Sequence, residues 1–335
     1  MAETGSPLSV LIVGCGDIAG GYDEAGDDKA VRTHAGAYGR DDRFHVAACI
    51  DPDATRRAQF MAYWGVDEGF PDLAACRAGG GAYDVASVCV PTAHHGDALE
   101  GLLEMPLKAV LAEKPLTGDA ARSRRIVEAY AEAARPLAVN YLRRFDAEMA
   151  RLQAEIAAGA WGSLQSASAH YAKGLVNCGS HAIDLLHFLI GPLSPVGVTD
   201  TVTDYQLNDP TVSALLKTEA GAEVRLVGCD SRMYFPFELD LVMEKGRISL
   251  EDLGGRLRRR WVRPHPLFLH QPALDDGVWT ETELPHALAN AVGSLYDHLK
   301  NQTPLPSDGA SALLTEEVCA GLIKLAAAKS EGERG

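Results

Sequence analysis

The stretch Ser9-Val10-Leu11-Ile12-Val13-Gly14-Cys15-Gly16-Asp17-Ile18-Ala19-Gly20 decides the fold of the first half of this chain. A short apolar run leads directly into a G-x-G-x-x-A pattern, which predicts a strand, a tight turn and the start of a helix. Gly14 suits the turn, Gly16 lets the main chain approach a pyrophosphate, and Ala19 or Gly20 permits close helix packing. Amide groups at such a helix start bind phosphates. The stretch therefore predicts a Rossmann-type sheet that binds a dinucleotide through Gly14, Gly16, Asp17 and Ile18.

A second apolar run, Phe44–Ile50, ends at an acidic residue, Asp51. A carboxylate in this place can accept hydrogen bonds from the hydroxyl groups of the adenosine ribose. It also repels a 2′-phosphate, so we expect NAD in preference to NADP. Arg56 and Arg57 follow closely and could neutralise that extra charge, which leaves NADP as the alternative.

The segment between these motifs exceeds the usual spacing of about 20 residues. The excess is residues 21–33, which carry four acids: Asp23, Glu24, Asp27 and Asp28. Because four acids would repel a pyrophosphate, we expect a loop that faces away from it. A lid that reaches the substrate or a neighbouring subunit is the alternative. His34 and Tyr38 then lie on the resumed helix.

Two further strands end in motifs that carry chemistry. Residues 84–90 are followed by PTAHH at 91–95, and residues 109–111 by EKP at 113–115. The carboxyl ends of parallel strands meet at one edge of a sheet, where open α/β folds bind ligands. We therefore expect the cofactor to contact Pro91, Thr92, His95, Glu113, Lys114 and Asn140. The paired histidines have no further ligands at a plausible spacing, so no metal is expected.

Bulk properties exclude several classes of protein. The 335 residues suit two domains, and the 47% hydrophobic and 23% charged fractions are ordinary for a folded chain. The net charge of −15 repels nucleic acid and anionic lipid, so we expect neither nucleic acid nor a membrane as a partner. It also opposes an anionic cofactor, so a dinucleotide site must supply local donors.

The sequence also bears on the compartment. Residues 1–7 resemble neither a signal peptide nor a transit peptide, and no apolar run approaches the roughly 18 residues of a membrane span. The seven cysteines are scattered and form no C-x-x-C pair. These features predict reduced thiols in a cytoplasmic protein.

Six motifs in this order resemble the Gfo/Idh/MocA family of oxidoreductases, named after glucose-fructose oxidoreductase, inositol dehydrogenase and a rhizopine-catabolism protein. They are GCGDIA at 14–19, PTAHH at 91–95, EKP at 113–115, NYLRRF at 140–145, GAWGS at 159–163 and GLVNCGSHAIDLLHFLIG at 174–191. The resemblance covers nearly the whole chain and implies an α/β fold. Residues 1–140 would form a Rossmann domain with a doubly wound parallel sheet. Residues 141–335 would form an α/β domain for substrate binding and oligomerisation, with a large, mostly antiparallel sheet. The C-terminal helix would pack back near the first domain, in a homodimer or homotetramer.

Local patterns in the second half agree with this fold. Apolar or alternating segments of strand length cover residues 164–171, 211–218, 223–229 and 237–243. Helical patterns cover residues 180–190 and 311–328.

The segment around His181 holds the strongest chemical candidate of the second half. The family usually carries aspartate four residues before this histidine, where the chain has Asn177. An amide can only orient an imidazole, so Asn177 makes simple inositol-type substrates doubtful. Asp184 and His187 would share roughly one side of the helix with His181. A metal triad is conceivable, but we expect Asp184 to cap or salt-bridge and His187 to pack.

By resemblance, Lys114 and His181 carry out the reaction, in which a hydride passes to nicotinamide while the hydroxyl proton leaves. The Lys114 cation would polarise the alcohol or ketone oxygen, and His181 would take the proton. The roles could be exchanged, because a buried lysine with a lowered pKa can itself be the base. Glu113 would hold the ribose or the lysine, and the peptide bond before Pro115 is often cis in this family.

The resemblance also implies which side chains hold a sugar-type substrate. They are Asn140, Arg143, Arg144, Tyr171, Lys173, Asn177, His181 and Asp184. Two arginines and a lysine predict an anionic group on the substrate, such as a diphosphate or carboxylate. The alternative is that the arginines form salt bridges between the domains.

Three functions remain open. The first is an NAD(P)-dependent dehydrogenase or ketoreductase that acts on a sugar, polyol or nucleotide-linked sugar. The second is an enzyme that retains NAD and uses a transient ketone to eliminate or hydrolyse a group. The third is a non-catalytic, dinucleotide-binding regulatory protein. Its best support is Asn177, although some family members that act on nucleotide-linked sugars also resemble this asparagine form, so Asn177 alone does not argue against an enzyme.

Overall fold

The computed structural model describes residues 6–23, 30–268 and 270–332. The chain divides into two compact units, Met1–Phe145 with Pro285–Leu313 and Asp146–Leu284 with Leu314–Gly335. The chain therefore returns to the first unit after residue 284, in a stretch that the sequence analysis places in the second domain. None of the described helices combines the length and apolarity that crossing a membrane requires.

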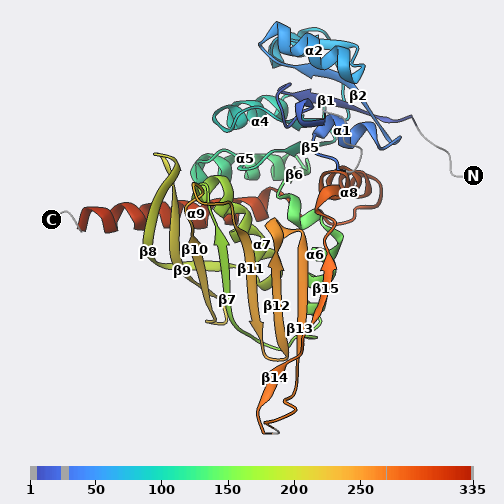
Figure 1. Ribbon diagram of the computed structural model, residues 1–335. Helices are drawn as coiled ribbons and strands as arrows, with labels where there is room; N and C mark the ends of the chain where they lie inside the picture. Colours follow the sequence, from blue (N-terminus) through green and yellow to red (C-terminus); the bar gives the residue numbers. More distant parts are fainter. Residues whose placement is uncertain (1–5, 24–29, 269, 333–335) are drawn as a thin grey trace, which may run out of the picture. The chain divides into compact units, whose positions relative to one another are not determined.

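A six-stranded parallel sheet forms the centre of the first unit (Figure 1). Its strands are β1 (Leu8–Val13), β2 (Phe44–Ile50), β3 (Glu68–Phe70), β4 (Val85–Val88), β5 (Ala109–Ala112) and β6 (Leu137–Val139). Their order is β3-β2-β1-β4-β5-β6, and every neighbouring pair is parallel. β4, β5 and β6 are wholly buried, as expected where helices cover both faces. This order confirms the predicted Rossmann-type fold.

Two apolar cores flank this sheet. One includes residues of α1 (His34–Gly39) and α8 (Ala287–Asn301). The other includes residues of α3 (Leu73–Ala78), α4 (His95–Leu103) and α5 (Ala120–Glu132). The carboxylates of Asp53, Asp72 and Asp119 cap the amino ends of α2 (Ala54–Trp64), α3 and α5.

The insertion interrupts the helix that follows β1. The amides of Ala19 and Gly20 donate to Gly16 O (3.1 and 3.2 Å), so one helical turn follows the glycines. The next regular helix, α1, starts at His34, whose amide donates to Ile18 O (3.1 Å). An uninterrupted helix would make that bond from residue 22. The predicted helix start is thus a single turn, and the regular helix resumes only at His34.

Asp23 links the two described ends of this insertion, residues 21–23 and 30–33. Its carboxylate accepts hydrogen bonds from the amide of Thr33 (3.0 Å) and from the Thr33 hydroxyl (2.5 Å). Thr33 in turn caps α1 by accepting from Gly36 N. Glu24, Asp27 and Asp28, on which the prediction of an outward-facing loop also rests, lie outside the described residues.

The second unit contains a mostly antiparallel sheet of nine strands. The strands are β7 (Leu164–Tyr171), β8 (Leu193–Gln206), β9 (Asp209–Thr218), β10 (Glu223–Gly228), β11 (Phe237–Met243), β12 (Gly246–Glu251), β13 (Arg256–Pro264), β14 (Pro272–Leu274) and β15 (Val278–Glu281). Their order is β14-β13-β12-β11-β7-β10-β9-β8, with β15 on β13, and only β7 and β10 pair in parallel. This sheet confirms the predicted second half of the fold.

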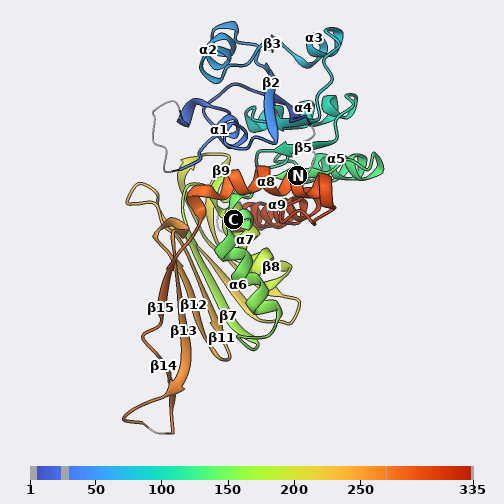
Figure 2. The same ribbon diagram turned by 90° about the vertical axis from the view of Figure 1, so that its right-hand side faces the viewer.

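Helices cover one face of the second sheet (Figure 2). They are α6 (Ala147–Ala157) and α7 (Ser180–Ile190), joined in the core by α9 (Gly309–Gly332), which begins in the first unit. Alternate residues of β7 and β11 point into this core, as the pleat of a half-covered sheet requires. Trp161 is fully buried and stacks on Trp261, with ring centroids 3.8 Å apart.

Candidate active site

The polar motifs of the first unit lie in a row along one edge of its sheet. In the order of the strands, Asp51 follows β2, the glycine turn follows β1, Pro91 follows β4, Glu113 follows β5 and Asn140 follows β6. Since all six strands are parallel, these carboxyl ends share an edge. The strand order reverses between β1 and β4, where doubly wound sheets bind dinucleotides.

The two glycines of the turn meet different surroundings. Gly14 has φ +97°, and a Cβ there would lie 2.8 Å from the main-chain carbon of Cys89 and 2.8 Å from Val90 N. No side chain fits at that position. A Cβ on Gly16 would meet no atom of the described residues within 4 Å. The main chain at Gly16 therefore borders open space, which fits the close approach of a pyrophosphate.

Asp51 holds the glycine turn in place. Its Oδ2 accepts from Cys15 N (2.9 Å) and its Oδ1 accepts from Asp53 N (2.9 Å). The Asp51 side chain is buried, and Arg56 Nη1 lies 3.6 Å from Oδ2. A carboxylate has about four acceptor positions, so Asp51 keeps capacity for a ribose hydroxyl while it fixes the turn.

Glu113 is the centre of a buried polar network at the end of β5. Its Oε1 lies 3.0 Å from His34 Nε2 and accepts from Asn140 Nδ2 at 2.7 Å. His34 Nδ1 lies 3.2 Å from Ser87 Oγ, which is 2.9 Å from the Tyr38 hydroxyl. The His34 side chain is fully buried, and the Glu113 side chain is 12% exposed. Only the part of the Glu113 carboxylate that faces away from His34 is therefore accessible to a ligand.

The pKa values of this pair favour two charged groups. Burial alone lowers the pKa of His34, but the neighbouring Cys89 sulfur and the Glu113 carboxylate raise it to about 10. Burial alone raises the pKa of Glu113, but the bonds and charge of His34, the Asn140 amide and the Lys114 charge hold it below its usual value. An imidazolium and a carboxylate thus face each other at neutral pH.

Asn140 carries the one orphaned atom of this network. Its side chain is 4% exposed, and its Oδ1 has no hydrogen-bond partner among the residues that the structure describes. Because its amide nitrogen donates to Glu113, the free atom is an acceptor. Buried acceptors normally find a donor. The open space at Gly16 and this acceptor both fit a bound dinucleotide.

Lys114 follows Glu113 directly and precedes a cis peptide bond to Pro115. Its main-chain amide donates to Glu113 Oε2 (3.3 Å), and its side chain is partly exposed. His95 lies behind this segment. Its ring is 1% exposed, with Nδ1 2.6 Å from Pro115 O and Nε2 2.8 Å from Val90 O. His95 thereby joins the ends of β4 and β5, in contrast to the direct cofactor contact predicted for it.

The remaining candidates of the first unit lie on two short turns. Pro91 and Thr92 are exposed at the start of the turn η2 (Thr92–His94). Arg143 and Arg144 lie on η3 (Leu142–Phe145). Arg144 is 7% exposed and its Nη1 donates to Pro306 O (3.3 Å), so part of its guanidinium has a structural role.

In the second unit, a turn held by two carboxylates presents Lys173, Asn177 and His181. Lys173 has φ +66°, and its amide donates to Asp204 Oδ2 (2.9 Å). Asp209 accepts from the amides of Val176 (2.8 Å) and Asn177 (2.9 Å), at the start of the π-helix η4 (Leu175–Gly179). His181 follows in the first turn of α7 and is partly exposed.

The polar contacts of these candidates differ. Lys173 is exposed, with Nζ 5.4 Å from the centroid of the Tyr205 ring. The Asn177 side-chain amide donates to Lys173 O (3.1 Å), so it helps to fix the turn. Asp184 is 1% exposed, and its Oδ1 accepts from Thr315 Oγ1 (3.4 Å). This burial fits the expected capping or pairing role of Asp184 better than contact with a substrate.

Tyr171 has no exposed surface with which to contact a substrate. It is fully buried in the core of the second unit, where its hydroxyl donates to Val212 O (2.8 Å) and accepts from Val212 N (2.7 Å). Burial is also the main reason why the pKa of Tyr171 lies well above its usual value. The predicted substrate role of Tyr171 is therefore replaced by a structural one.

This assignment predicts the behaviour of a Tyr171→Phe variant. Removing the hydroxyl leaves the amide and carbonyl of Val212 without that partner, so we expect the free energy of unfolding to fall by about 1–3 kcal/mol. The KM for any substrate should stay unchanged. Urea unfolding followed by circular dichroism, together with steady-state kinetics, measures both quantities. A raised KM in a variant of unchanged stability would contradict the structural role.

Three residues that hold candidate side chains in place were not predicted: His34 in the first unit, and Asp204 and Asp209 in the second. His34 was placed on the correct helix, but its partner is 79 residues away. Asp204 and Asp209 flank the hairpin between β8 and β9, where acids are common and carry no signal of their own.

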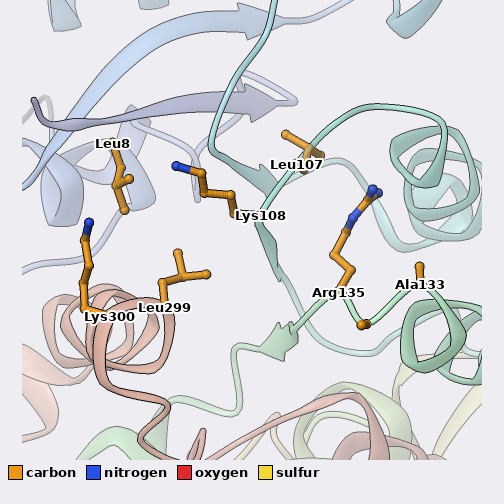
Figure 3. A pocket seen from close by; sticks show the side chains of 8 residues that line it. Leu8, Leu107, Lys108, Ala133, Arg135, Leu299 and Lys300 are labelled. Atoms are coloured by element: carbon orange, nitrogen blue, oxygen red, sulfur yellow. The ribbon is translucent and has the colours of Figure 1, made fainter.

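A separate pocket of about 470 Å³ lies at the opposite edge of the first sheet (Figure 3). It is lined by Leu8 at the start of β1, Lys108 before β5, Arg135 before β6 and Lys300 of α8. Lys108 already pairs with Asp84 (2.7 Å), and Arg135 donates to the carbonyls of Leu102 and Met105. In the described part of the chain, no cluster of three or more His, Cys, Asp or Glu side chains could hold a metal ion.

The fold and the row of strand ends define a Rossmann-type unit suited to binding a dinucleotide, and comparison with known proteins agrees. Residues 8–141 match the family described as "Oxidoreductase family, NAD-binding Rossmann fold", which is the Gfo/Idh/MocA family. This segment belongs to that family, which confirms the resemblance seen in the sequence.

Individual relatives cover more of the chain. Inositol 2-dehydrogenase of Corynebacterium glutamicum (strain R) is 29% identical over 235 residues, which are 64% of this chain and 68% of that protein. Among solved structures, the WlbA dehydrogenase from Bordetella pertussis, in complex with NADH and UDP-GlcNAcA, has a TM-score of 0.78 at 19% identity, with 96% of each chain covered. KijD10, a 3-ketoreductase from Actinomadura kijaniata in complex with NADP, has a TM-score of 0.74 at 17% identity, with 95% of this chain and 97% of that chain covered. At these identities the two structures establish the fold of the chain.

Proposed function

We propose that this protein is an NAD-dependent oxidoreductase that moves a hydride between nicotinamide and a secondary alcohol or ketone of a sugar, polyol or nucleotide-linked sugar. The observation that carries the proposal is the row of strand ends, from Asp51 past the open main chain at Gly16 to Glu113, Lys114 and Asn140. The family of residues 8–141 supports it. The bound dinucleotide supplies the carbon that accepts or donates the hydride.

The chain's own residues divide the remaining work. Gly14 and Gly16 keep a main-chain surface clear for the pyrophosphate, and Asp51 accepts ribose hydroxyls. The carboxylate at Asp51 favours NAD, because it repels the 2′-phosphate of NADP. NADP is the alternative, because the exposed Arg56 beside Asp51 could neutralise that phosphate. Lys114 polarises the alcohol or ketone oxygen, and its charge stabilises an alkoxide as the hydroxyl proton leaves.

His181 takes the hydroxyl proton in this proposal, and its environment suits a base. It is partly exposed on the first turn of α7, so its imidazole can exchange a proton with solvent after each turnover. The relatives named above are an inositol 2-dehydrogenase, a dehydrogenase in complex with UDP-GlcNAcA and a 3-ketoreductase, and they support a hydroxyl or ketone group as the reacting group. The exposed Lys173 supports a substrate with an anionic group.

The His181→Asn variant tests the proton acceptor. We expect kcat to fall by about 10²–10⁴-fold, the usual contribution of a positioned base, while the Kd for NADH stays unchanged. The assay follows reduced-nicotinamide absorbance with a panel of polyols and nucleotide-linked sugars. His298→Asn is the matched control, because His298, like His181, is partly exposed and its Nδ1 lies 2.8 Å from Thr303 O, away from the strand ends.

The same assay separates the three functions. Net formation of NADH supports the dehydrogenase. Conversion of substrate without a net change in absorbance would identify an enzyme that retains its NAD. Tight dinucleotide binding without conversion of any substrate in the panel would support the regulatory protein.

A further inference from the structure

A buried histidine of the resumed helix lies behind the site and has no part in the proposed reaction. His34 is the first residue of α1, directly after the insertion, and its side chain has no exposed surface. Its Nε2 lies 3.0 Å from Glu113 Oε1. Glu113 in turn accepts from the Lys114 amide and borders the edge of the sheet where the cofactor would lie.

The hydrogen-bond pattern fixes the direction of this contact. A carboxylate only accepts, so His34 Nε2 must donate to Glu113. The Asn140 amide donates to the same Oε1, which leaves Oε2 turned toward the Lys114 main chain. Two donors on one oxygen hold the carboxylate plane in a single orientation. Charge-assisted bonds of this kind are among the strongest in proteins.

His34 is itself held by its second ring nitrogen. Nδ1 lies 3.2 Å from Ser87 Oγ on the buried strand β4, and the Tyr38 hydroxyl lies 2.9 Å from the same oxygen. A chain of four side chains therefore runs from Tyr38 through Ser87 and His34 to Glu113. Burial strongly destabilises an unpaired carboxylate, so the imidazolium of His34 supplies the partner that keeps Glu113 charged and fixed.

We propose that His34 is a positioning residue, which keeps Glu113 ionised and aimed at the dinucleotide and thereby fixes the Lys114 segment. This inference rests on the proposed function, because Glu113 has a ligand to hold only if a dinucleotide binds. The proposal also assigns a role to the first residue after the insertion: α1 resumes at His34, where the side chain can reach Glu113.

The pH dependence of this link has a defined sign. The titratable groups that face the pair are Cys89 after β4, Tyr38 through Ser87, and Lys114. A raised pKa of about 10 means that the stability gained by protonated His34 is lost as pH rises through that value. The lowered pKa of Glu113 means that its contribution is lost on acidification. The link therefore acts between these two limits.

The test uses His34→Gln, which keeps a donor and an acceptor but removes the cation. Without the cation, the pKa of Glu113 rises, so we expect NADH binding at pH 6 to weaken by about tenfold or more and to recover in part at pH 8. Wild type should bind equally at both pH values. NADH fluorescence titration of the full chain measures this, and urea unfolding of the same protein without cofactor measures the ion pair alone.

Two further variants keep the test decisive. Glu113→Gln should bind NADH weakly and independently of pH, and the double variant His34→Gln/Glu113→Gln should bind no more weakly than Glu113→Gln. His298→Asn is the matched control: its Nδ1 lies 2.8 Å from Thr303 O, outside the chain of side chains that ends at Glu113, and we expect wild-type binding at both pH values. A folded His34→Gln that binds NADH like wild type from pH 6 to 8 overturns the inference. If His34→Gln alone does not fold, a folded double variant that binds NADH more weakly than Glu113→Gln overturns it instead. If wild type binds neither NADH nor NADPH, the proposed function fails first.

Discussion

Replacing Lys114 by methionine should lower kcat by about 10²–10⁴-fold and leave the Kd for NADH close to that of the wild type. The charge of Lys114 is needed when negative charge develops on the substrate oxygen, so its loss affects the transition state more than the bound cofactor. Methionine preserves most of the length and volume of the side chain. Steady-state rates with the best substrate of the panel, together with an NADH titration, give both quantities.

The matched control for this variant is Lys108→Met. Lys108 directly precedes β5, whereas Lys114 lies after the other end of the same strand. The Lys108 ammonium pairs with Asp84 at the opposite edge of the sheet. We expect kcat to stay within about twofold of wild type, since exposed ion pairs contribute little. A Lys114→Met enzyme that retained turnover within tenfold of the control would remove Lys114 from the mechanism.

The second large effect separates the two glycines of the turn. Gly14→Ala should lower the free energy of unfolding by about 3 kcal/mol or more, because the positive φ is strained and the new Cβ meets the Cys89–Val90 main chain. Gly16→Ala should leave stability within about 0.5 kcal/mol of wild type, because its Cβ would enter open space. The same methyl group should weaken NADH binding by tenfold or more, since it occupies the space left for the pyrophosphate.

Urea unfolding and NADH titration measure the free energy of unfolding and the Kd for NADH of both alanine variants. The stability of Gly14→Ala and the Kd of Gly16→Ala are the two values that can contradict the roles assigned to these glycines. A Gly14→Ala protein as stable as wild type would mean that the turn is not built as described. A Gly16→Ala protein that binds NADH like wild type would mean that the phosphates lie elsewhere.

Much of the secondary structure of both units could be predicted from local sequence. The strands over Phe44–Ile50 and Leu164–Tyr171 and the helix over Ser180–Ile190 begin and end where the patterns indicate. The apolar run at Phe44–Ile50 marks a strand because a parallel strand is covered on both faces, and the alternation at Leu164–Tyr171 marks a strand whose sheet is covered on one face. β3 and β6 were not predicted, because each spans only three residues and leaves no periodicity to read.

The site was harder to predict because its decisive contacts join residues distant in sequence. His34 reaches Glu113 only because α1 resumes after an insertion and packs beside β4 and β5. Tyr171 and Lys173 are two residues apart, which in a strand would place them on one face, but the strand ends at Tyr171 and Lys173 adopts φ +66°. One side chain therefore enters the core while the other is exposed. The return of α8 to the first unit likewise depends on tertiary packing, as in its contacts with η3 and α1.

The most direct test of dinucleotide binding at this row of strand ends is a fluorescence titration of the purified wild-type protein with NADH and NADPH. We expect saturable binding of NADH, and weaker binding of NADPH because Asp51 repels the 2′-phosphate. Failure of both to bind at millimolar concentration would contradict the assignment of the Asp51, Gly16 and Glu113 edge as a cofactor site.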